Sequence, residues 1–245
     1  MEPKTASLEK TLIVIPAYNE DESILQTLED ITSQKLGFDI VVVNDGSKDN
    51  TANEVLKAGI DILNLPCNLG YGAAVETGFR YAIKNEYTRV VLMDSDGQHD
   101  PTFIQAMVNT MDTGNFDVII GSRFKGTVNY SIPITRKLGI LFFRKIVKLI
   151  TKQNILDVTS GFQLLNQKAV KFLLNENYPS DYPDSDVITK LLLSGFNVFE
   201  VPVTIHARGK GNSMHSSKSK TTYYIYKMIL SLLLVALTHR IKKEV

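Results

Sequence analysis

The first half of the chain alternates short apolar runs with longer segments in which apolar residues recur at helical spacing. The short runs are continuously apolar, which is typical of strands buried on both faces. The predicted strands are Thr11–Tyr18, Phe38–Asp45, Ile60–Pro66, Arg89–Asp96 and Asp117–Phe124. The predicted helices are Asp21–Gln34, Asn50–Lys57, Tyr71–Asn85 and Pro101–Met111. We expect Asn19 to cap the first helix and Pro101 to take the first position of the last one.

Repeated strand–helix units predict an α/β fold with a mostly parallel sheet and right-handed crossovers. In such a sheet the ligand binds in the crevice beyond the carboxyl ends of the strands. Polar or glycine-rich segments lie at the ends of the five predicted strands or shortly after them. They are Pro16–Glu20, Asn44–Thr51, Asn68–Ala74, Asp94–Asp100 and Gly121–Arg123. We therefore expect one extended site along a single edge of the sheet.

Asp94 and Asp96, at the end of the fourth predicted strand, form the sharpest chemical motif. A tight turn there would bring both carboxylates towards one cation, and hard carboxylate oxygens suit Mg²⁺ or Mn²⁺ bridged to substrate phosphates. The alternative is an ordinary acidic turn that caps the next helix. An EF-hand is excluded, because Gly97 comes too early and Gln105 stands where that loop needs a glutamate.

Two other strand-end segments also allow a structural and a functional interpretation. Asp45 either caps a helix or accepts a hydrogen bond from a nucleobase N–H. Asn68–Gly72 is either a plain turn or a glycine-rich helix entry whose N–H groups favour an anion. The segment is neither a dinucleotide fingerprint, since Val75 replaces the third glycine, nor a P-loop, since no Gly-Lys-Ser/Thr follows.

The composition indicates the class of protein and the cellular compartment. The 245 residues are 44% hydrophobic and 22% charged, which is the composition of a globular protein. A formal net charge of +1 gives no indication of nucleic-acid binding, and the single cysteine, Cys67, excludes an internal disulfide and a Cys-based zinc site. Because Met1–Lys10 is polar and lacks the apolar core of a signal peptide, we expect a cytoplasmic protein.

The small net charge hides a strong asymmetry along the chain. Residues 1–122 carry 8 basic and 19 acidic residues, whereas 123–152 and 208–243 each carry 8 basic and no acidic residues. Such segments suit an anionic surface or a phosphorylated ligand, with solvated helix faces as the alternative. Ile134–Lys152 predicts a basic amphipathic helix that either lies in a membrane interface or packs its apolar face on the sheet.

Tyr223–Leu237 is the most apolar stretch of the chain. Its charge-free core, Met228–Leu237, is too short to cross about 30 Å of hydrocarbon. Tyrosines at one end and Arg and Lys at the other suit interfacial anchoring. We interpret it as a helix at the membrane surface or bound to a partner, and not as a span.

In combination, the motifs resemble family 2 glycosyltransferases of the GT-A fold. The matching segments are Pro16–Glu20, Val43–Ser47, Asn68–Gly72, Asp94–His99, Gly121–Phe124 and Thr159–Phe162, within a region from about Thr11 to Ser213. Gln98-His99, Asp157–Phe162 and Glu200–Val203 running to Arg208 resemble the dolichyl- or polyprenyl-phosphate sugar transferases within that family.

The resemblance implies a role for each matching residue. Those expected to bind the nucleotide donor are Pro16, Ala17, Tyr18, Glu20, Asp45, Asn68, Gly72, Asp94 and Ser95. Asp94 and Asp96 would hold the donor diphosphate through Mg²⁺ or Mn²⁺. Those expected on the acceptor phosphate are Arg136, Ser160, Arg208, Lys210 and Ser213.

The resemblance also implies a late carboxylate that acts as a base, and the candidates are Asp184 and Asp186. Asp186 is the better match, although the subgroup more often has Glu there. An acidic turn before a helix at Val187–Leu193 is the alternative for both residues.

The expected domains are a polar segment (1–10), a GT-A domain (11–213) and a C-terminal helix at a membrane interface or on a partner (214–245). The expected enzyme is an inverting, metal-dependent glycosyltransferase at the inner face of the cell membrane. It would move a sugar from a nucleotide donor, with UDP-glucose and UDP-N-acetylglucosamine favoured, to a polyprenyl phosphate. A small membrane protein or a second copy of the chain is a further candidate partner.

Two alternative functions remain from the sequence. One is a family 2 enzyme that extends a cell-surface polysaccharide or glycolipid at a hydroxyl group. The other is a non-catalytic scaffold that binds a nucleotide sugar.

Overall fold

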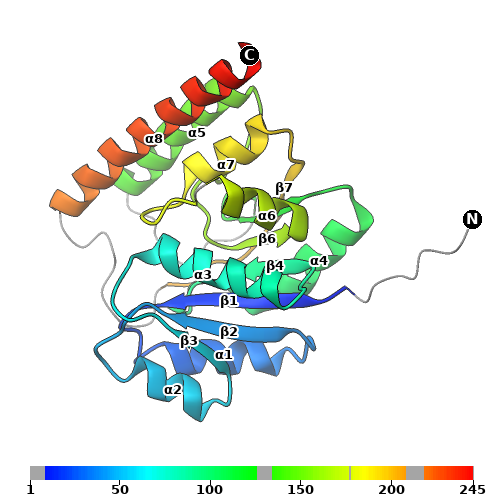
Figure 1. The fold of residues 1–245 in the computed structure, drawn as a ribbon, viewed down its shortest axis with the longest axis vertical. Helices are drawn as coiled ribbons and strands as arrows, with labels where there is room; N and C mark the ends of the chain where they lie inside the picture. The colour runs from blue at the N-terminus through cyan, green and yellow to red at the C-terminus, as the bar shows by residue number, and fades with distance from the viewer. Residues whose placement is uncertain (1–8, 126–133, 177, 208–217, 245) are drawn as a thin grey trace, which may run out of the picture.

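A computed structural model of the chain describes residues 9–125, 134–176, 178–207 and 218–244, without the side chains of 134–136, 218–221 and 242–244. Figure 1 shows a central sheet with helices on both faces. The elements of the first half are β1 (Thr11–Ala17), α1 (Ile24–Ser33), β2 (Asp39–Asn44), α2 (Thr51–Lys57), β3 (Asp61–Asn64), α3 (Tyr71–Lys84), β4 (Arg89–Leu92), η1 (Pro101–Phe103), α4 (Ile104–Thr113) and β5 (Val118–Ser122). Those of the second half are α5 (Ile134–Thr151), β6 (Gln163–Asn166), α6 (Gln167–Asn175), α7 (Ser185–Leu193), β7 (Val198–Pro202) and α8 (Lys218–Glu244).

The strands form one sheet in the order β3-β2-β1-β4-β6-β5-β7. β1 to β4 run parallel, β5 runs parallel to β7, and β6 runs antiparallel to both β4 and β5. The predicted mostly parallel α/β sheet is confirmed, although β6 and β7 were not predicted. Because the end of β4 pairs with the start of β6, at Leu92 and Gln163, the segment before β6 lies beside the end of β4.

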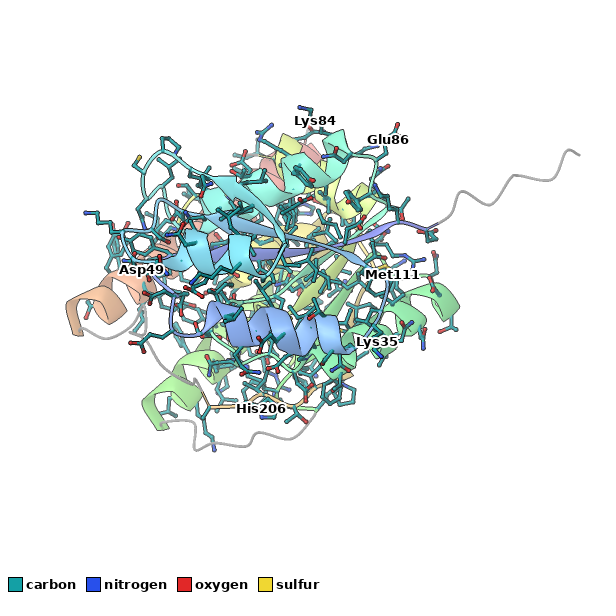
Figure 2. The ribbon with its side chains drawn as sticks, turned by 90° about the horizontal axis from the view of Figure 1, so that it is seen from below. Lys35, Asp49, Lys84, Glu86, Met111 and His206 are labelled. Atoms are coloured by element: carbon teal, nitrogen blue, oxygen red, sulfur yellow. The ribbon has the colours of Figure 1, made fainter. Side chains whose placement is uncertain are left out.

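The strands at the centre of the sheet are buried on both faces, as their continuous apolarity predicts. All seven residues of β1 are buried. Successive side chains of a strand point to opposite faces, so Val14 belongs to the hydrophobic cluster that includes residues of α3, α5, α6, α7 and α8, whereas Ile15 belongs to the one that includes residues of α1 and α4. Figure 2 views the molecule from the side of α1, with Met111 of α4 labelled.

The first helix begins later than its sequence pattern predicts. α1 starts at Ile24, after Ser23, so the prediction that Asn19 caps it is wrong. Asn19 instead adopts a left-handed backbone conformation (φ 53°), and its Oδ1 accepts a hydrogen bond from the Lys48 N–H at 2.8 Å. The side chain therefore joins the loops after β1 and β2. Pro101 does open a helical turn, as predicted.

Three late helices, α5, α7 and α8, form one end of the molecule (Figure 1). α7 contacts both α5 and α8, and Phe143 of α5 meets Tyr224 of α8 edge to face, with ring centroids 6.0 Å apart. Met228 and Leu232 of α8 are buried in the same core as α3. The C-terminal helix therefore packs against the rest of the described fold.

Within the described residues, α8 is also the one helix whose length and composition would allow it to cross a membrane. The window Thr222–Ile241 has a mean hydropathy of 1.4, and only 11% of it is buried. The whole helix is thus longer than the charge-free core Met228–Leu237 considered in the sequence, because the window also includes Lys227 and Arg240. The position of α8 at a membrane surface or on a partner stays a prediction.

α5 buries only some of its apolar residues. Ile140, Phe143 and Val147 are buried. Phe142 and Leu149 are exposed. The helix therefore packs one narrow apolar strip on α7 and leaves other apolar side chains, along with its lysines, at the surface.

Candidate active site

The loops after β1 and β2 form one interlocked rim. The Asn19 N–H donates to Ser47 Oγ at 2.9 Å, and the Glu20 N–H donates to Thr51 Oγ1 at 2.9 Å. Pro16 and Ala17 lie in the buried end of β1, and Tyr18 follows them at the surface, 39% exposed. The residues predicted to line the nucleotide from this loop therefore lie together on the expected edge of the sheet.

Asp45 connects the end of β2 to the entry of α3. The side chain is buried, and its two oxygens accept hydrogen bonds from the N–H groups of Leu69 at 2.7 Å and Gly70 at 3.0 Å. It does not cap α2, because Asn50 precedes that helix. Each carboxylate oxygen has a further lone pair, so the arrangement leaves acceptor capacity for a nucleobase N–H.

The glycine-rich entry of α3 serves close packing. A Cβ on Gly72 would lie 1.9 Å from the carbonyl oxygen of Pro179, and the Ala73 N–H donates to the Ser180 carbonyl at 3.3 Å. α3 is thereby brought against the segment that leads to Asp184. Asn68 is exposed beside this entry. A nucleotide contact by Asn68 or Gly72 stays a prediction.

Asp94 has two neighbours that orient its carboxylate. The Tyr71 hydroxyl donates to Oδ1 at 2.9 Å, and burial raises the pKa of Tyr71, which keeps this donor protonated. The Asp94 N–H donates to His99 Nδ1 at 3.1 Å, which requires the ring proton to be on Nε2, 3.7 Å from Asp94 Oδ2. Phe162 stacks on the His99 ring with centroids 5.0 Å apart.

The Asp94 carboxylate remains accessible because its neighbour across the sheet is a glycine. A Cβ on Gly161 would lie 3.2 Å from Asp94 Oδ2. Asp96 is nearly buried, and its Oδ1 accepts from the Gln98 N–H at 3.1 Å, which closes the turn; Ser95 between them is buried. The helix-cap alternative for the acidic pair is wrong, because Asp100 caps η1 by accepting from the Thr102 N–H at 2.9 Å.

This donor set fits a divalent cation that keeps ligands from its substrate. Among the described residues, no group of three or more His, Cys, Asp and Glu side chains could enclose a metal ion. Mg²⁺ is usually bound by only one or two carboxylates together with substrate phosphates, and Mn²⁺ prefers the same oxygen ligands. Asp94 and Asp96 can supply those carboxylates.

Asp184, directly before α7, lies within electrostatic reach of Asp94. Its Oδ2 accepts a hydrogen bond from the Tyr224 hydroxyl at 2.8 Å. Burial raises the pKa of Asp184 to about 7; the charges of Asp186 and Asp94 act in the same direction, against the Tyr224 hydrogen bond and Arg123. The side chain keeps partial solvent access. A carboxylate titrating near neutrality is suited to general base catalysis.

Asp186 is held by the backbone at the start of α7 and by α8. The residue is buried, its Oδ1 accepts from the Asp184 and Val187 N–H groups at 3.1 and 2.9 Å, and its Oδ2 accepts from the Ser231 hydroxyl of α8. It lines a pocket of about 410 Å³ between α6, α7 and α8. Asp184 lies before the helix and Asp186 in its first turn, and the two carboxylates bind different residues of α8. The sequence favoured Asp186, whereas Asp184 is the carboxylate with solvent access and a raised pKa; the base role of either residue stays a prediction.

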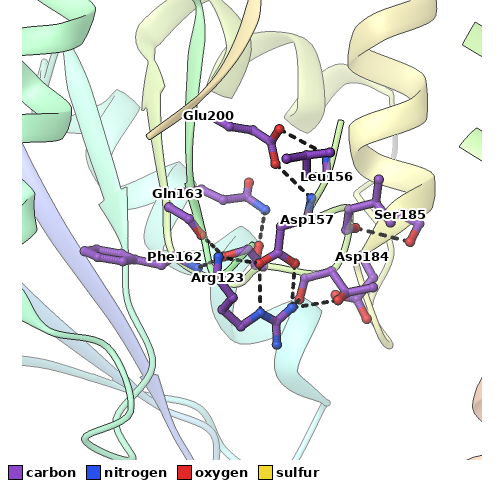
Figure 3. Close-up of polar contacts among 12 residues, drawn as sticks. Arg123, Leu156, Asp157, Phe162, Gln163, Asp184, Ser185 and Glu200 are labelled. Atoms are coloured by element: carbon purple, nitrogen blue, oxygen red, sulfur yellow. Dashed lines mark hydrogen bonds and ion pairs between the residues drawn. The ribbon is translucent and has the colours of Figure 1, made fainter. Parts of the chain in front are cut away.

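Arg123 and Asp157 form a buried ion pair that sequence reasoning missed. Figure 3 shows the Arg123 backbone N–H and guanidinium on Asp157, at 2.9, 2.8 and 2.6 Å. Glu200 of β7 accepts from the N–H groups of Asp157 and Leu156 at 2.8 and 3.0 Å. The network fixes the end of β5 to β7 and to the segment before β6. Both motifs were visible in the sequence, but nothing there indicated that they pair.

The predicted acceptor-phosphate residues are only partly within the described chain. Ser160 is buried, and its hydroxyl donates to the Gly121 carbonyl at 2.7 Å and accepts from the Phe162 N–H at 3.3 Å. The hydroxyl therefore holds β5 to the segment before β6. Arg136 lies in the first turn of α5 without a described side chain, and Arg208, Lys210 and Ser213 lie outside the described residues. The phosphate role of this set stays a prediction.

The site combines a strand-end acidic pair, a glycine that opens it and a carboxylate within electrostatic reach of it. The sequence profile of glycosyl transferase family 2 matches residues 12–174, which include β1 to β6 and the acidic pair. The chain belongs to glycosyl transferase family 2. As a family 2 enzyme it is a nucleotide-sugar-dependent glycosyltransferase, so the scaffold alternative is not supported.

Relatives of this family 2 glycosyltransferase include enzymes named for lipid-phosphate acceptors. It is 29% identical to a dolichyl-phosphate beta-glucosyltransferase of Trichomonas vaginalis, covering 94% of this chain and 73% of the relative. It is 29% identical to the polyprenol monophosphomannose synthase of Mycolicibacterium smegmatis, covering 86% and 83%. It is 31% identical to the dolichol-phosphate mannosyltransferase of Pyrococcus furiosus, covering 90% of this chain and 64% of that longer protein.

Solved structures confirm the fold of the family 2 enzyme as GT-A. The glucosyl-3-phosphoglycerate synthase of Mycobacterium tuberculosis, in complex with Mn²⁺, uridine diphosphate and glucosyl-3-phosphoglycerate, superposes with a TM-score of 0.69. The match covers 93% of this chain and 80% of that one at 19% identity. The GT-A fold and the family expected from the motifs are therefore confirmed.

Proposed function

We propose that this glycosyltransferase moves a sugar from a UDP-sugar to a polyprenyl phosphate at the cytoplasmic face of a membrane. The observation that carries the proposal is the place of the Asp94 carboxylate. Tyr71 and His99 orient it, Gly161 leaves it accessible, and its charge acts on Asp184, which accepts a hydrogen bond from α8. In this proposal the loops at the strand ends form the nucleotide site, and α5, α7 and α8 form an apolar, basic acceptor region.

The donor side rests on the rim formed by the loops after β1, β2 and β4. Tyr18 and Asp45 would meet the base and ribose, and Asp94 and Asp96 would hold Mg²⁺ or Mn²⁺ with the diphosphate. When bound, the metal neutralises the negative charge that develops on the departing nucleoside diphosphate. Uridine diphosphate in the mycobacterial structure and glucosyltransfer by the Trichomonas relative support a UDP-sugar.

The reaction we propose is a direct displacement. An oxygen of the acceptor phosphate forms a bond to the anomeric carbon while the bond from that carbon to the diphosphate breaks, which inverts the configuration and releases UDP. An acceptor phosphate is already ionised, so Asp184 needs to remove at most one proton. Its pKa of about 7 fits this modest task.

The acceptor side rests on the exposed surface of α5 and α8. Leu138, Phe142 and Leu149 of α5 are exposed together with Lys137 and Lys148 of the same helix. Apolar side chains flanked by lysines suit the interface of an anionic membrane. We propose that residues 11–213 are the catalytic domain and that 214–245, which contain α8, hold it at the inner face.

A second candidate is transfer to a hydroxyl group of a glycolipid or cell-surface polysaccharide. The observation that favours it is the raised pKa of Asp184, because a hydroxyl acceptor needs a general base to remove its proton. The donor side and the metal would be the same in both reactions.

One experiment separates the two candidates. The protein is incubated with Mn²⁺ and each of UDP-glucose, UDP-N-acetylglucosamine and GDP-mannose, with either a short polyprenyl phosphate or the matching polyprenol, and the lipid product is identified by mass. We expect a glycosyl phosphate lipid from one UDP-sugar and no product from the polyprenol. Product from polyprenol alone would favour the second candidate, and use of GDP-mannose alone would overturn the donor.

A further inference from the structure

The orientation of Asp184 is set from outside its own helix. Asp184 stands at the N-cap position of α7, where a carboxylate ordinarily accepts from the free N–H groups of the helix. Among the described residues it makes no such side-chain capping bond. Its Oδ2 instead accepts from the Tyr224 hydroxyl of α8, 40 residues further along the chain. The bond from α8 therefore replaces the local one.

Tyr224 is itself held by aromatic contacts. Its ring lies edge to face with Tyr182, at 5.3 Å between centroids, and with Phe143 of α5, at 6.0 Å. Such contacts fix the ring plane and hence the direction of the hydroxyl. Three separate parts of the chain thus determine where the Tyr224 hydroxyl lies.

α8 presents one face to the domain and the opposite face outward. Tyr224, Met228, Ser231 and Leu232, at helical spacing, meet Asp184, the core and Asp186. The exposed apolar residues of the other face are Tyr226, Leu230, Leu233 and Leu237. The helix that orients the carboxylate therefore also carries exposed apolar residues on its outward face.

We infer that Tyr224 is a positioning residue. By packing on the catalytic domain, α8 holds the Tyr224 hydroxyl in place, and this hydroxyl orients Asp184 towards the Asp94 metal motif. This inference rests on the role of Asp184 in the proposed function. A reacting group displaced by about 1 Å can cost about a hundredfold in rate. Movement of α8 relative to α7 would therefore change the direction of Asp184 through the Tyr224 hydroxyl.

The test compares Tyr224→Phe with Tyr226→Phe in the full chain. Tyr226 is 66% exposed on the outward face of α8 and serves as the matched control. With the donor that gives product and a short polyprenyl phosphate, we expect Tyr224→Phe to lower kcat by about ten- to a hundredfold. The donor KM and UDP affinity should stay unchanged, and Tyr226→Phe should behave like the wild type. An unchanged kcat in Tyr224→Phe would overturn the inference.

A double-mutant cycle shows whether Tyr224 acts through Asp184. If it does, adding Tyr224→Phe to Asp184→Asn causes no further loss of kcat, because the group to be oriented is already disabled. A further loss of the same factor in that background would contradict the inference. Normal activity of Asp184→Asn alone would instead overturn the proposed role of Asp184, so the two failures are distinguishable.

Ser231→Ala separates positioning from general loosening of the helix. It removes the hydrogen bond that the Ser231 hydroxyl of α8 donates to Asp186. We expect a lower free energy of unfolding and an unchanged kcat. If Ser231→Ala lowers kcat as much as Tyr224→Phe, the overall packing of α8 affects kcat and the Tyr224 hydroxyl has no particular role.

Discussion

Different kinds of hydrogen bond hold the carboxylates in two regions of the molecule, the strand-end rim and the helical end formed by α5, α7 and α8. At the rim, side chains bond to the backbone of neighbouring loops, as Asp45 does to Leu69 and Gly70. At the helical end, side chains bond to side chains of distant elements, as Asp184 does to Tyr224 and Asp186 to Ser231. The strand order of the sheet therefore determines where the donor-side residues lie, whereas the packing of α7 against α8 determines where the acceptor-side residues lie.

The largest expected effect concerns the rim. Asp94→Asn and Asp96→Asn should each lower the transfer rate by on the order of a thousandfold, because the diphosphate leaves with its charge less compensated. The rate is measured with saturating donor and Mn²⁺. The control is Asp30→Asn on the exposed side of α1, which should keep full activity. Full activity of both aspartate variants in chelator would contradict the metal assignment.

The next effect concerns the ion pair that fixes the end of β5 to the segment before β6. Asp157→Ala leaves the Arg123 guanidinium, 7% exposed, without its bidentate partner. Removing one member of a buried pair costs about 3–5 kcal/mol of the free energy of unfolding, measured by chemical denaturation. Lys57→Gln breaks an exposed pair with Glu54 and should cost less than about 1 kcal/mol. Similar losses in the two variants would show that the network is not structural.

A smaller effect tests whether the helical end meets a membrane. Replacing the exposed Lys137, Lys145 and Lys148 of α5 with Gln should weaken binding to anionic vesicles by on the order of a hundredfold, since each charge contributes about 1 kcal/mol. Added salt should mimic the change. The matched control replaces Lys35, Lys57 and Lys84, of which Lys35 and Lys84 are labelled in Figure 2. Equal weakening by both triple variants would remove α5 from the membrane contact.

The smallest effect concerns the contact between α3 and the segment that leads to Asp184. Gly72→Ala should lower the free energy of unfolding by about 1–3 kcal/mol, because the new methyl would meet the Pro179 carbonyl. Gly139→Ala in α5, with nothing within 4 Å of the added methyl, should be neutral or gain up to about 1 kcal/mol. The pair is compared by thermal and chemical unfolding. A neutral Gly72→Ala would mean that α3 and the segment before Asp184 are not in close contact.

The same contrast explains what the sequence could predict. β1, β2, β4 and β5 were predicted because a strand buried on both faces leaves a continuous apolar run. β6 and β7 were missed because neither is a continuous apolar run: β6 has only Leu164 and Leu165 between polar residues, and Glu200 interrupts the edge strand β7. The acidic pair was predicted because it follows its strand directly.

The helical end resisted prediction because its bonds are long-range. Asp186 matched the family motif better than Asp184, but the direction of each carboxylate depends on α8, 40 and 45 residues further along the chain. Arg123 and Asp157 are 34 residues apart, and only the antiparallel entry of β6 brings them together. Local pattern carries no information about such pairs.

The most direct test of the division into a donor side and an acceptor side is a two-substrate kinetic comparison of Asp45→Ala and Arg136→Ala. For each variant, KM is measured for the UDP-sugar and for a short polyprenyl phosphate, with unfolding followed in parallel. Loss of a hydrogen bond to a charged group predicts at least about a tenfold rise in KM. We predict that rise for the donor alone in Asp45→Ala and for the acceptor alone in Arg136→Ala. If either variant raises both KM values equally, the two sides are not separate sites and the account is contradicted.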